Sequence, residues 1–270
     1  MDLFQALILG IVQGATEYIP VSSSAHLVLV PWFLGWPDPS FEFEVLIQLG
    51  TLVGVFIFFW QDIWGIIKGV IQGLVSLKPL ATFEAKLGWL VFVATLPSVL
   101  GLIFKDFFEQ AYARPQLAGG FLIFTALLLT VAERFGARSR DLKALSWLDA
   151  LIIGFWQVAA ILPGISRSGA TISGAVLRNF DRSTAARFSF LMSIPALLAA
   201  GGVAFLDLVQ EGTVTSQLPA ISMGFIAAAI SGYLCIRWLL HYLQRHSLYA
   251  FAIYCLILSI FSIIFGFLGG

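Results

Sequence analysis

Long apolar runs are the feature that most constrains how this chain can fold. Six of them are long enough to cross a bilayer as a helix, which takes about 20 residues. They lie at about 43–60, 86–104, 116–133, 188–206, 219–236 and 248–268. Only 11% of the 270 residues are charged, against about a quarter in soluble domains. The sequence therefore predicts an all-α integral membrane protein with six transmembrane helices.

Two further apolar regions, about 3–36 and 147–178, are each interrupted in the middle by proline, glycine and serine. Irregular backbone at membrane depth is tolerated only where protein or a water-filled cavity covers it. We therefore expect two re-entrant helix-loop-helix hairpins that line something polar. A third stretch, 62–77, mixes lysine and glutamine with apolar residues, and it is expected to lie along the membrane interface or to dip into it.

The placement of lysine and arginine orients the predicted spans, because cytoplasmic loops carry an excess of these residues. The cytoplasmic segments are then 61–86, 134–143, 178–187 and 237–247, and the opposite ones are 37–42, 105–115 and 207–218. Twelve of the 15 basic residues fall on the cytoplasmic side, and Lys105 and Arg114 fall on the other. Arg167, inside the second broken region, is the one left over. This count requires that neither broken region crosses the bilayer, and it puts both termini outside.

An internal repeat with an offset of about 144 residues supports this topology. Its pairs are "ALILGIVQ" with "ALIIGFWQ", "PVSSSA" with "PGISRSGA", and "FEVLIQLG" with "FSFLMSIP". The repeat divides one membrane domain, 1–270, into halves at about 1–140 and 141–270. Each half holds one hairpin and three spans, so the second half is inserted upside down, as in inverted-topology repeats. The hairpin tips should then meet near the midplane, with Glu17 opposite Arg167.

The first hairpin contains "QGATEYIPVSSSAH", residues 13–26. Gln13 and Glu17 share one helix face because they are four residues apart. An ionisable residue inside the membrane is by default a functional candidate, although Glu17 could also serve only to pair with Arg167. A carboxylate beside an amide suits a hard divalent cation, Mg²⁺ or Ca²⁺. Glu17, with Gln13 as a second ligand, is therefore the candidate metal site, completed by substrate phosphate and water.

Three serines and a histidine follow in the same motif. Ser22, Ser23 and Ser24 can cap the next helix, which is the usual role of serines at such a position. His26 lies within one helical turn of Ser23, and a serine with a histidine in reach is the minimal activated nucleophile. Burial in a membrane hairpin beside a carboxylate favours the catalytic interpretation of Ser23 and His26.

The second hairpin contains "PGISRSGATISG", residues 163–174. Ser166, Ser168 and Thr171 supply hydroxyls at the start of a helix expected over about 170–178, and a helix N-terminus binds anions. Arg167 adds a planar fork that matches phosphate oxygens, although an arginine can also merely anchor a loop. We expect these groups, together with Ser22 and Ser24, to bind phosphate.

An anion site, a carboxylate with a nucleophile–base pair, and membrane burial together fit a phosphorylated lipid substrate. Phosphoryl transfer needs mainly positioning and charge neutralisation. A lipid transporter or flippase remains an alternative, because inverted repeats with broken helices are typical of transporters. An intramembrane serine protease leaves Arg167 without a role. No pattern indicates a nucleic-acid partner, and whether two copies form a homodimer is left open.

The motifs at 13–26 and 163–174 resemble the two signature motifs of the bacterial undecaprenyl-diphosphate phosphatases, the bacitracin-resistance family, and the likeness runs nearly end to end. The resemblance implies a multi-pass enzyme of the bacterial plasma (inner) membrane. Its implied reaction removes the terminal phosphate of C55-isoprenyl diphosphate with a divalent cation, at the periplasmic face, to recycle the cell-wall carrier lipid.

The resemblance also implies roles for individual residues. Glu17 is the second acidic position of the first motif, Ser23 and His26 are its catalytic candidates, and Arg167 is the phosphate-binding arginine. Gln13 occupies a position that the family fills with Glu or Gln, so a site with two carboxylates is not expected here.

Overall fold

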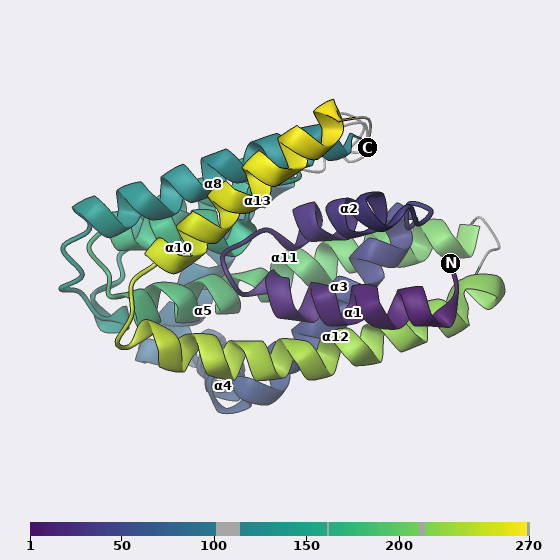
Figure 1. Ribbon diagram of the computed structural model, residues 1–270. Helices are drawn as coiled ribbons and strands as arrows, with labels where there is room; N and C mark the ends of the chain where they lie inside the picture. The colour runs from purple at the N-terminus through teal and green to yellow at the C-terminus, as the bar shows by residue number, and fades with distance from the viewer. Residues whose placement is uncertain (101–113, 161, 211–213, 269–270) are drawn as a thin grey trace.

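A computed structural model describes residues 1–100, 114–160, 162–210 and 214–268, and its regular elements are helices (Figure 1). The α-helices are α1 (Leu3–Glu17), α2 (Ser23–Leu34), α3 (Phe41–Phe58), α4 (Trp60–Val75), α5 (Phe83–Thr95), α8 (Pro115–Phe135), α9 (Trp147–Ala159), α10 (Arg167–Leu177), α11 (Arg182–Gln210), α12 (Val214–Leu243) and α13 (Tyr249–Phe267). Two short 3-10 helices, η1 (Leu96–Ser98) and η2 (Leu142–Ala144), complete the described elements.

Five helices are long and apolar enough to cross a membrane. They are α3, α8, α11, the Gln217–Leu243 part of α12, and α13, and they confirm a multi-pass all-α protein. The helix α11 begins six residues before the predicted span because Asp181 caps it, accepting from the Thr184 amide at 2.9 Å. The sixth predicted span, 86–104, begins in α5 and η1, and its last residues lie outside the described part.

The first broken region forms two helices separated by residues 18–22. A capping box starts α1, with the Gln5 amide donating to the Asp2 carboxylate at 2.7 Å. The Ser22 side chain caps α2, and Gly35, in the left-handed conformation with φ 63°, ends it. Left-handed backbone is the conformation for which glycine is the usual residue.

The second broken region likewise forms a helix pair, α9 and α10. A capping box of Ser146 and Asp149 starts α9, and the Ser166 side chain caps α10 by accepting from the Gly169 amide at 3.0 Å. All four helices of the two hairpins therefore begin at a serine or aspartate cap, and the cap of α2 at Ser22 is one that the sequence pattern indicated.

The helices pack in a way that brings the two hairpins together. The first hairpin lies against α12 and α3 through α1, and against α8 through α2, whereas α10 packs on α8 and α9 on α5. In Figure 1, α8 and α13 run side by side as one layer above the others. The larger apolar core, which includes Tyr18, Leu122 and Phe188, joins residues of both halves. The turn of each hairpin therefore lies inside the protein.

Two buried carboxylates, Asp149 and Glu133, form ion pairs that join helix ends on one side of the molecule. Asp149 accepts from Arg140 at 2.6 Å and from Arg178 at 2.7 Å. Glu133 pairs with Arg138 at 2.6 Å and with Arg182. The two carboxylates are buried, whereas the arginines that pair with them are partly exposed. Loss of an arginine would leave a buried carboxylate with fewer partners, so these pairs fix how the helices meet at the end where α9 and α11 begin.

Candidate active site

The two hairpin turns meet inside the protein. The Arg167 Nη2 atom lies 2.6 Å from Glu17 Oε1, although 150 residues separate them in the chain. The Ser168 hydroxyl donates to the Ile19 carbonyl at 3.3 Å, and the Gly164 amide lies 3.5 Å from the Ser24 hydroxyl. The prediction that the tips meet, with Glu17 opposite Arg167, is confirmed.

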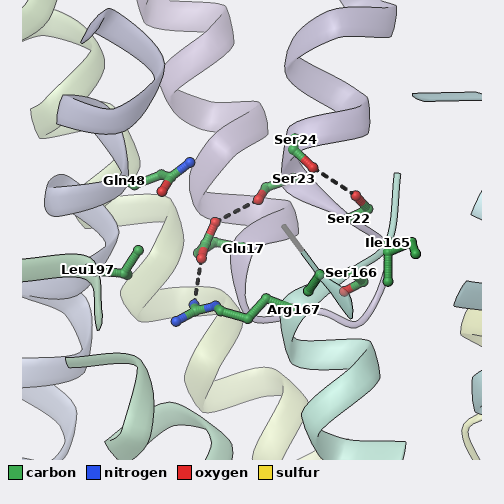
Figure 2. A pocket seen from close by; sticks show the side chains of 10 residues that line it. Glu17, Ser22, Ser23, Ser24, Gln48, Ile165, Ser166, Arg167 and Leu197 are labelled. Carbon is green, nitrogen blue, oxygen red and sulfur yellow. Dashed lines mark hydrogen bonds and ion pairs between the residues drawn. The ribbon is translucent and has the colours of Figure 1, made fainter. Parts of the chain in front are cut away.

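Glu17 is the centre of the contacts at this junction (Figure 2). Its Oε2 atom accepts from the Ser23 hydroxyl at 2.6 Å and from the Gln13 amide at 2.7 Å, while Oε1 accepts from Arg167. Glu17 is 6% exposed and Gln13 is fully buried. Two hairpins and the serine that starts α2 are thus joined through one carboxylate.

The turn of the second hairpin is held by α8. The Thr125 hydroxyl donates to the Gly164 carbonyl at 2.9 Å and accepts from the Ser166 amide at 2.9 Å. Gly164 has φ 97°, and a Cβ atom added there would overlap the Ala118 carbonyl oxygen, so a side chain at this position would clash. This support places Arg167 at the first position of α10, with its side chain directed at Glu17.

A pocket of about 110 Å³ opens at the junction. It is lined by Glu17, Ser22, Ser23, Ser24, Gln48, Ala160, Ile165, Ser166, Arg167 and Leu197. Arg167 Nη1 is buried and makes no hydrogen bond among the described residues. A cation with an uncommitted donor, surrounded by hydroxyls, is suited to bind the oxygens of a phosphate group.

The predicted phosphate-binding residues divide into two sets. Ser22, Ser24, Ser166 and Arg167 line the pocket. Ser168 and Thr171 lie behind the lining: the Ser168 hydroxyl contacts Ser166 at 3.1 Å, and the Thr171 hydroxyl lies 2.6 Å from that of Ser189. The geometry therefore gives Ser168 and Thr171 supporting contacts rather than exposure to the pocket.

His26 does not hydrogen-bond to Ser23. Its Nδ1 atom lies 2.7 Å from the Ser22 carbonyl oxygen, and its Nε2 atom lies 2.7 Å from the Tyr254 hydroxyl. The base that Ser23 contacts is Glu17. A role for His26 in catalysis stays a prediction, and direct proton transfer from Ser23 requires that its ring move first.

One acceptor beside Glu17 has no partner. The Gln13 Oε1 atom is buried and accepts no hydrogen bond among the described residues. The described residues contain no group of three His, Cys, Asp or Glu side chains that could hold a metal. An amide oxygen and one carboxylate suit a hard cation that takes its remaining ligands from substrate and water.

Two residues of this region were not singled out from the sequence. Gln48, from α3, lines the pocket, and the signal for it was the motif "FEVLIQLG", in which it is a polar residue in an apolar span. Tyr254, from α13, contacts His26 and lies in an apolar run with no local signal of a site. Only the packing of α13 beside the hairpin brings Tyr254 to it.

Comparison with known proteins agrees with the motifs. The profile of a family described as "Bacitracin resistance protein BacA" matches residues 6–261. A protein of Chlorobaculum tepidum named "Undecaprenyl-diphosphatase" is 48% identical over 269 residues, covering 96% of this chain and 95% of its own. Proteins with the same name from Chlorobaculum parvum and Thermomicrobium roseum are 45% and 41% identical, covering 98% and 96% of this chain and 97% and 96% of their own. The chain therefore belongs to the bacitracin resistance protein BacA family.

Proposed function

We propose that this protein is an undecaprenyl-diphosphatase, which hydrolyses the C55-isoprenyl diphosphate to the monophosphate and inorganic phosphate. One observation carries the proposal: the meeting hairpins place the Ser23 hydroxyl and the Arg167 guanidinium on the two oxygens of Glu17, at the wall of one pocket. A nucleophile, a base and a phosphate-binding cation are thereby within reach of one bound group.

In the first step the Ser23 oxygen attacks the terminal phosphorus. The Ser23 Oγ–P bond forms, the bond from phosphorus to the bridging oxygen breaks, and the lipid monophosphate leaves. The Ser23 proton passes to Glu17, whose Oε2 atom already accepts it at 2.6 Å. A base in hydrogen-bond contact with a hydroxyl is the arrangement that activates a serine. Glu17 then passes this proton to the bridging oxygen of the departing lipid monophosphate and is again ionised.

In the second step water attacks the phosphorus of the phosphoserine and gives a proton to Glu17. The bond from phosphorus to Ser23 Oγ breaks, Glu17 returns the proton to that oxygen, and phosphate is released with Ser23 restored. The negative charge on the transferring group is held by Arg167, whose Nη1 atom has no partner among the described residues, and by the pocket hydroxyls of Ser22, Ser24 and Ser166. Preorganised donors in a water-poor site stabilise developing charge more strongly than donors in water.

Two contacts of the site allow a different role from the one proposed. His26 was expected to take the Ser23 proton, but its ring nitrogens contact Ser22 and Tyr254, which favours Glu17 as the first acceptor. The ion pair of Glu17 with Arg167 could also be purely structural. The unpartnered Nη1 atom and the pocket beside it favour a role in binding phosphate.

A divalent cation, Mg²⁺ or Ca²⁺, is part of the proposal. Glu17 would hold it together with phosphate oxygens and water. The unpartnered Gln13 Oε1 atom would join them once the amide turns over, because the Gln13 Nε2 atom is the one that faces Glu17. When bound, the cation would neutralise negative charge on the diphosphate.

We further propose that the protein lies in the bacterial plasma membrane with both hairpins re-entrant and the pocket open to the periplasmic side. The predicted lysine and arginine bias supports this orientation. Three residues that line the pocket are apolar: Ala160, Ile165 and Leu197. The first isoprene units of the substrate would contact them where the lipid chain leaves the polar part of the pocket.

Phosphate release by detergent-solubilised protein tests the proposed function. The purified protein is given a long-chain polyprenyl diphosphate, and inorganic phosphate is measured with Mg²⁺ or Ca²⁺ present and after chelation. Transport needs two compartments and hydrolysis does not, so release in detergent supports a phosphatase over a flippase. Absence of any release with each cation, by protein that remains folded, would contradict the proposal.

A further inference from the structure

The helix α13 contacts the turn of the first hairpin at two successive residues. The Tyr254 hydroxyl lies 2.7 Å from His26 Nε2, and the planes of the two rings are nearly parallel, at an angle of 3°. The next residue, Cys255, is fully buried, and its thiol lies 3.8 Å from the Pro20 carbonyl oxygen. The helix α13 therefore contacts residues that precede and follow Ser22 in the chain, Pro20 and His26.

His26 holds Ser22 at its carbonyl group. The His26 backbone amide donates to the Ser22 oxygen at 3.3 Å, and the ring Nδ1 atom lies 2.7 Å from the same oxygen. A carbonyl oxygen only accepts, so Nδ1 carries a hydrogen in this contact. The other ring nitrogen, Nε2, contacts the Tyr254 hydroxyl. The two contacts fix the orientation of the ring, which bridges Ser22 and α13.

Ser22 needs such support because its backbone is strained. It has φ 69° and ψ 93°, which L-residues rarely adopt. Such conformations persist only where the surrounding contacts determine them. Ser22 also caps α2 through the Ala25 amide at 3.4 Å. Because Ser23 follows directly, the Ser22 backbone sets where the Ser23 hydroxyl enters the pocket.

We infer that Tyr254 is a positioning residue of the active site, acting through His26 and the Ser22 backbone to aim the Ser23 hydroxyl. The inference rests on the proposed function for its kinetic consequence, whereas the contact itself can be measured without turnover. A small misplacement of an attacking atom lowers the chemical rate strongly. Substrate binding through Arg167 lies on the other hairpin and should change little.

The sharpest test is Tyr254→Phe, which removes one hydroxyl and keeps the ring. We expect kcat to fall about tenfold, equivalent to about 1.4 kcal/mol, with KM little changed. Tyr249→Phe, on the same helix, is the matched control and should leave kcat and KM at the values of the unsubstituted protein.

The chain has only three histidines, so ¹⁵N labelling of histidine lets NMR follow the ring nitrogens of His26 directly. Tyr254→Phe should shift the His26 Nε2 signal, and Tyr249→Phe should not.

A double-substitution cycle adds a readout that simple destabilisation does not reproduce. His26→Asn retains a side-chain donor near the Ser22 carbonyl but cannot reach Tyr254. If Tyr254 acts through His26, adding Tyr254→Phe to His26→Asn should lower kcat no further. An unchanged kcat in Tyr254→Phe would overturn the inference, as would a loss that is additive with His26→Asn or an unmoved His26 signal. An unsubstituted protein without phosphatase activity would instead contradict the proposed function, and the NMR signals would still report the contact.

Discussion

Glu17 binds three side chains with its two oxygens, and this one residue links the chemistry of the site. Ser23 and Gln13 share Oε2, and Arg167 takes Oε1. A proton that passes from Ser23 to Glu17 therefore weakens the ion pair of that carboxylate with Arg167. At the residue scale, each of these contacts predicts a different loss of function.

Ser23 is predicted to be the attacking nucleophile. Ser23→Ala removes the oxygen proposed to attack the phosphorus, so kcat should fall by about two powers of ten or more while substrate binding is retained. The measurement is steady-state phosphate release together with trapping of the phosphorylated protein and mapping of the phosphate. Ser24→Ala, the neighbouring pocket residue, should raise KM more than it lowers kcat. Near-normal turnover in Ser23→Ala, or phosphate mapped to His26, would exclude this mechanism.

Arg167 is predicted to act as a fork and not as a generic positive charge. Arg167→Lys should lower kcat/KM about 100-fold, because one ammonium cannot reproduce two parallel hydrogen bonds. Arg187→Lys is the matched control, because Arg187 pairs with Asp62 on the partly exposed surface and such pairs contribute little. The prediction that Arg167 binds phosphate as a fork is wrong if Arg167→Lys retains nearly full kcat/KM.

Glu17 and Gln13 are predicted to differ in their effect on metal use. Glu17→Gln should nearly abolish turnover while the protein stays folded, because the amide can neither take the Ser23 proton nor bind a cation as strongly. Gln13→Glu should keep activity and lower the Mg²⁺ or Ca²⁺ concentration at half-maximal rate, since it adds a second carboxylate. Phosphate release and thermal unfolding are measured over a cation titration. A fully active Glu17→Gln protein contradicts both roles of this carboxylate.

At the scale of whole elements, the position of the first hairpin depends on how closely α1 approaches α12. Gly10 and Gly14 are spaced as in small-xxx-small contacts between membrane helices. A Cβ atom added at Gly10 would overlap the Gly224 carbonyl, and one added at Gly14 would overlap the Ala228 carbonyl and the Ser231 hydroxyl. These two glycines let α1 lie directly on α12, and Glu17 follows one turn later.

Gly14→Ala should therefore destabilise the protein. Overpacking of a close contact costs about 1–3 kcal/mol, so the midpoint of thermal unfolding in detergent should fall, and activity should fall with it as Glu17 shifts. Gly120→Ala, in α8, meets nothing within 4 Å and should be neutral or slightly stabilising, because alanine favours helix. Equal midpoints for Gly14→Ala and Gly120→Ala would show that the α1–α12 approach is not limiting.

At the scale of the whole molecule, both termini lie at one end, and α8 and α12 end at the other (Figure 1). Glu133, whose carboxylate pairs with Arg182, lies in the last turn of α8. The basic residues that pair with Glu133 and with Asp149, such as Arg182 and Arg140, belong to the segments predicted to be cytoplasmic. The arrangement agrees with a topology in which the termini share one side and the basic loops share the opposite side. The predicted loops 105–115 and 207–218 lie partly outside the described residues.

Impermeant thiol labelling in intact cells tests which side is which. Gln210→Cys should be labelled from outside, and Ser139→Cys should be labelled only after the membrane is opened; both positions are exposed. The unsubstituted protein gives the background from Cys235 and Cys255. The reverse pattern would overturn the orientation drawn from lysine and arginine.

The sequence by itself determined the features that depend on local pattern. Apolar length predicted the five long helices, and proline, glycine and serine predicted where the hairpins break, because a helix in lipid needs about 20 apolar residues and a cap where it stops. The repeat placed Glu17 opposite Arg167, a contact that the structure contains. The motifs also indicated the family correctly.

The tertiary structure decided which side chains touch. Ser23 contacts Glu17 instead of His26 because of how α1 packs. In the same way, the packing of α3 places Gln48 in the pocket, and the packing of α13 brings Tyr254 to His26. Hydrogen bonds form only within about 3 Å and at suitable angles, so a small shift of a helix changes the partner. No spacing in the chain specifies such distances for residues that lie 228 positions apart, as His26 and Tyr254 do.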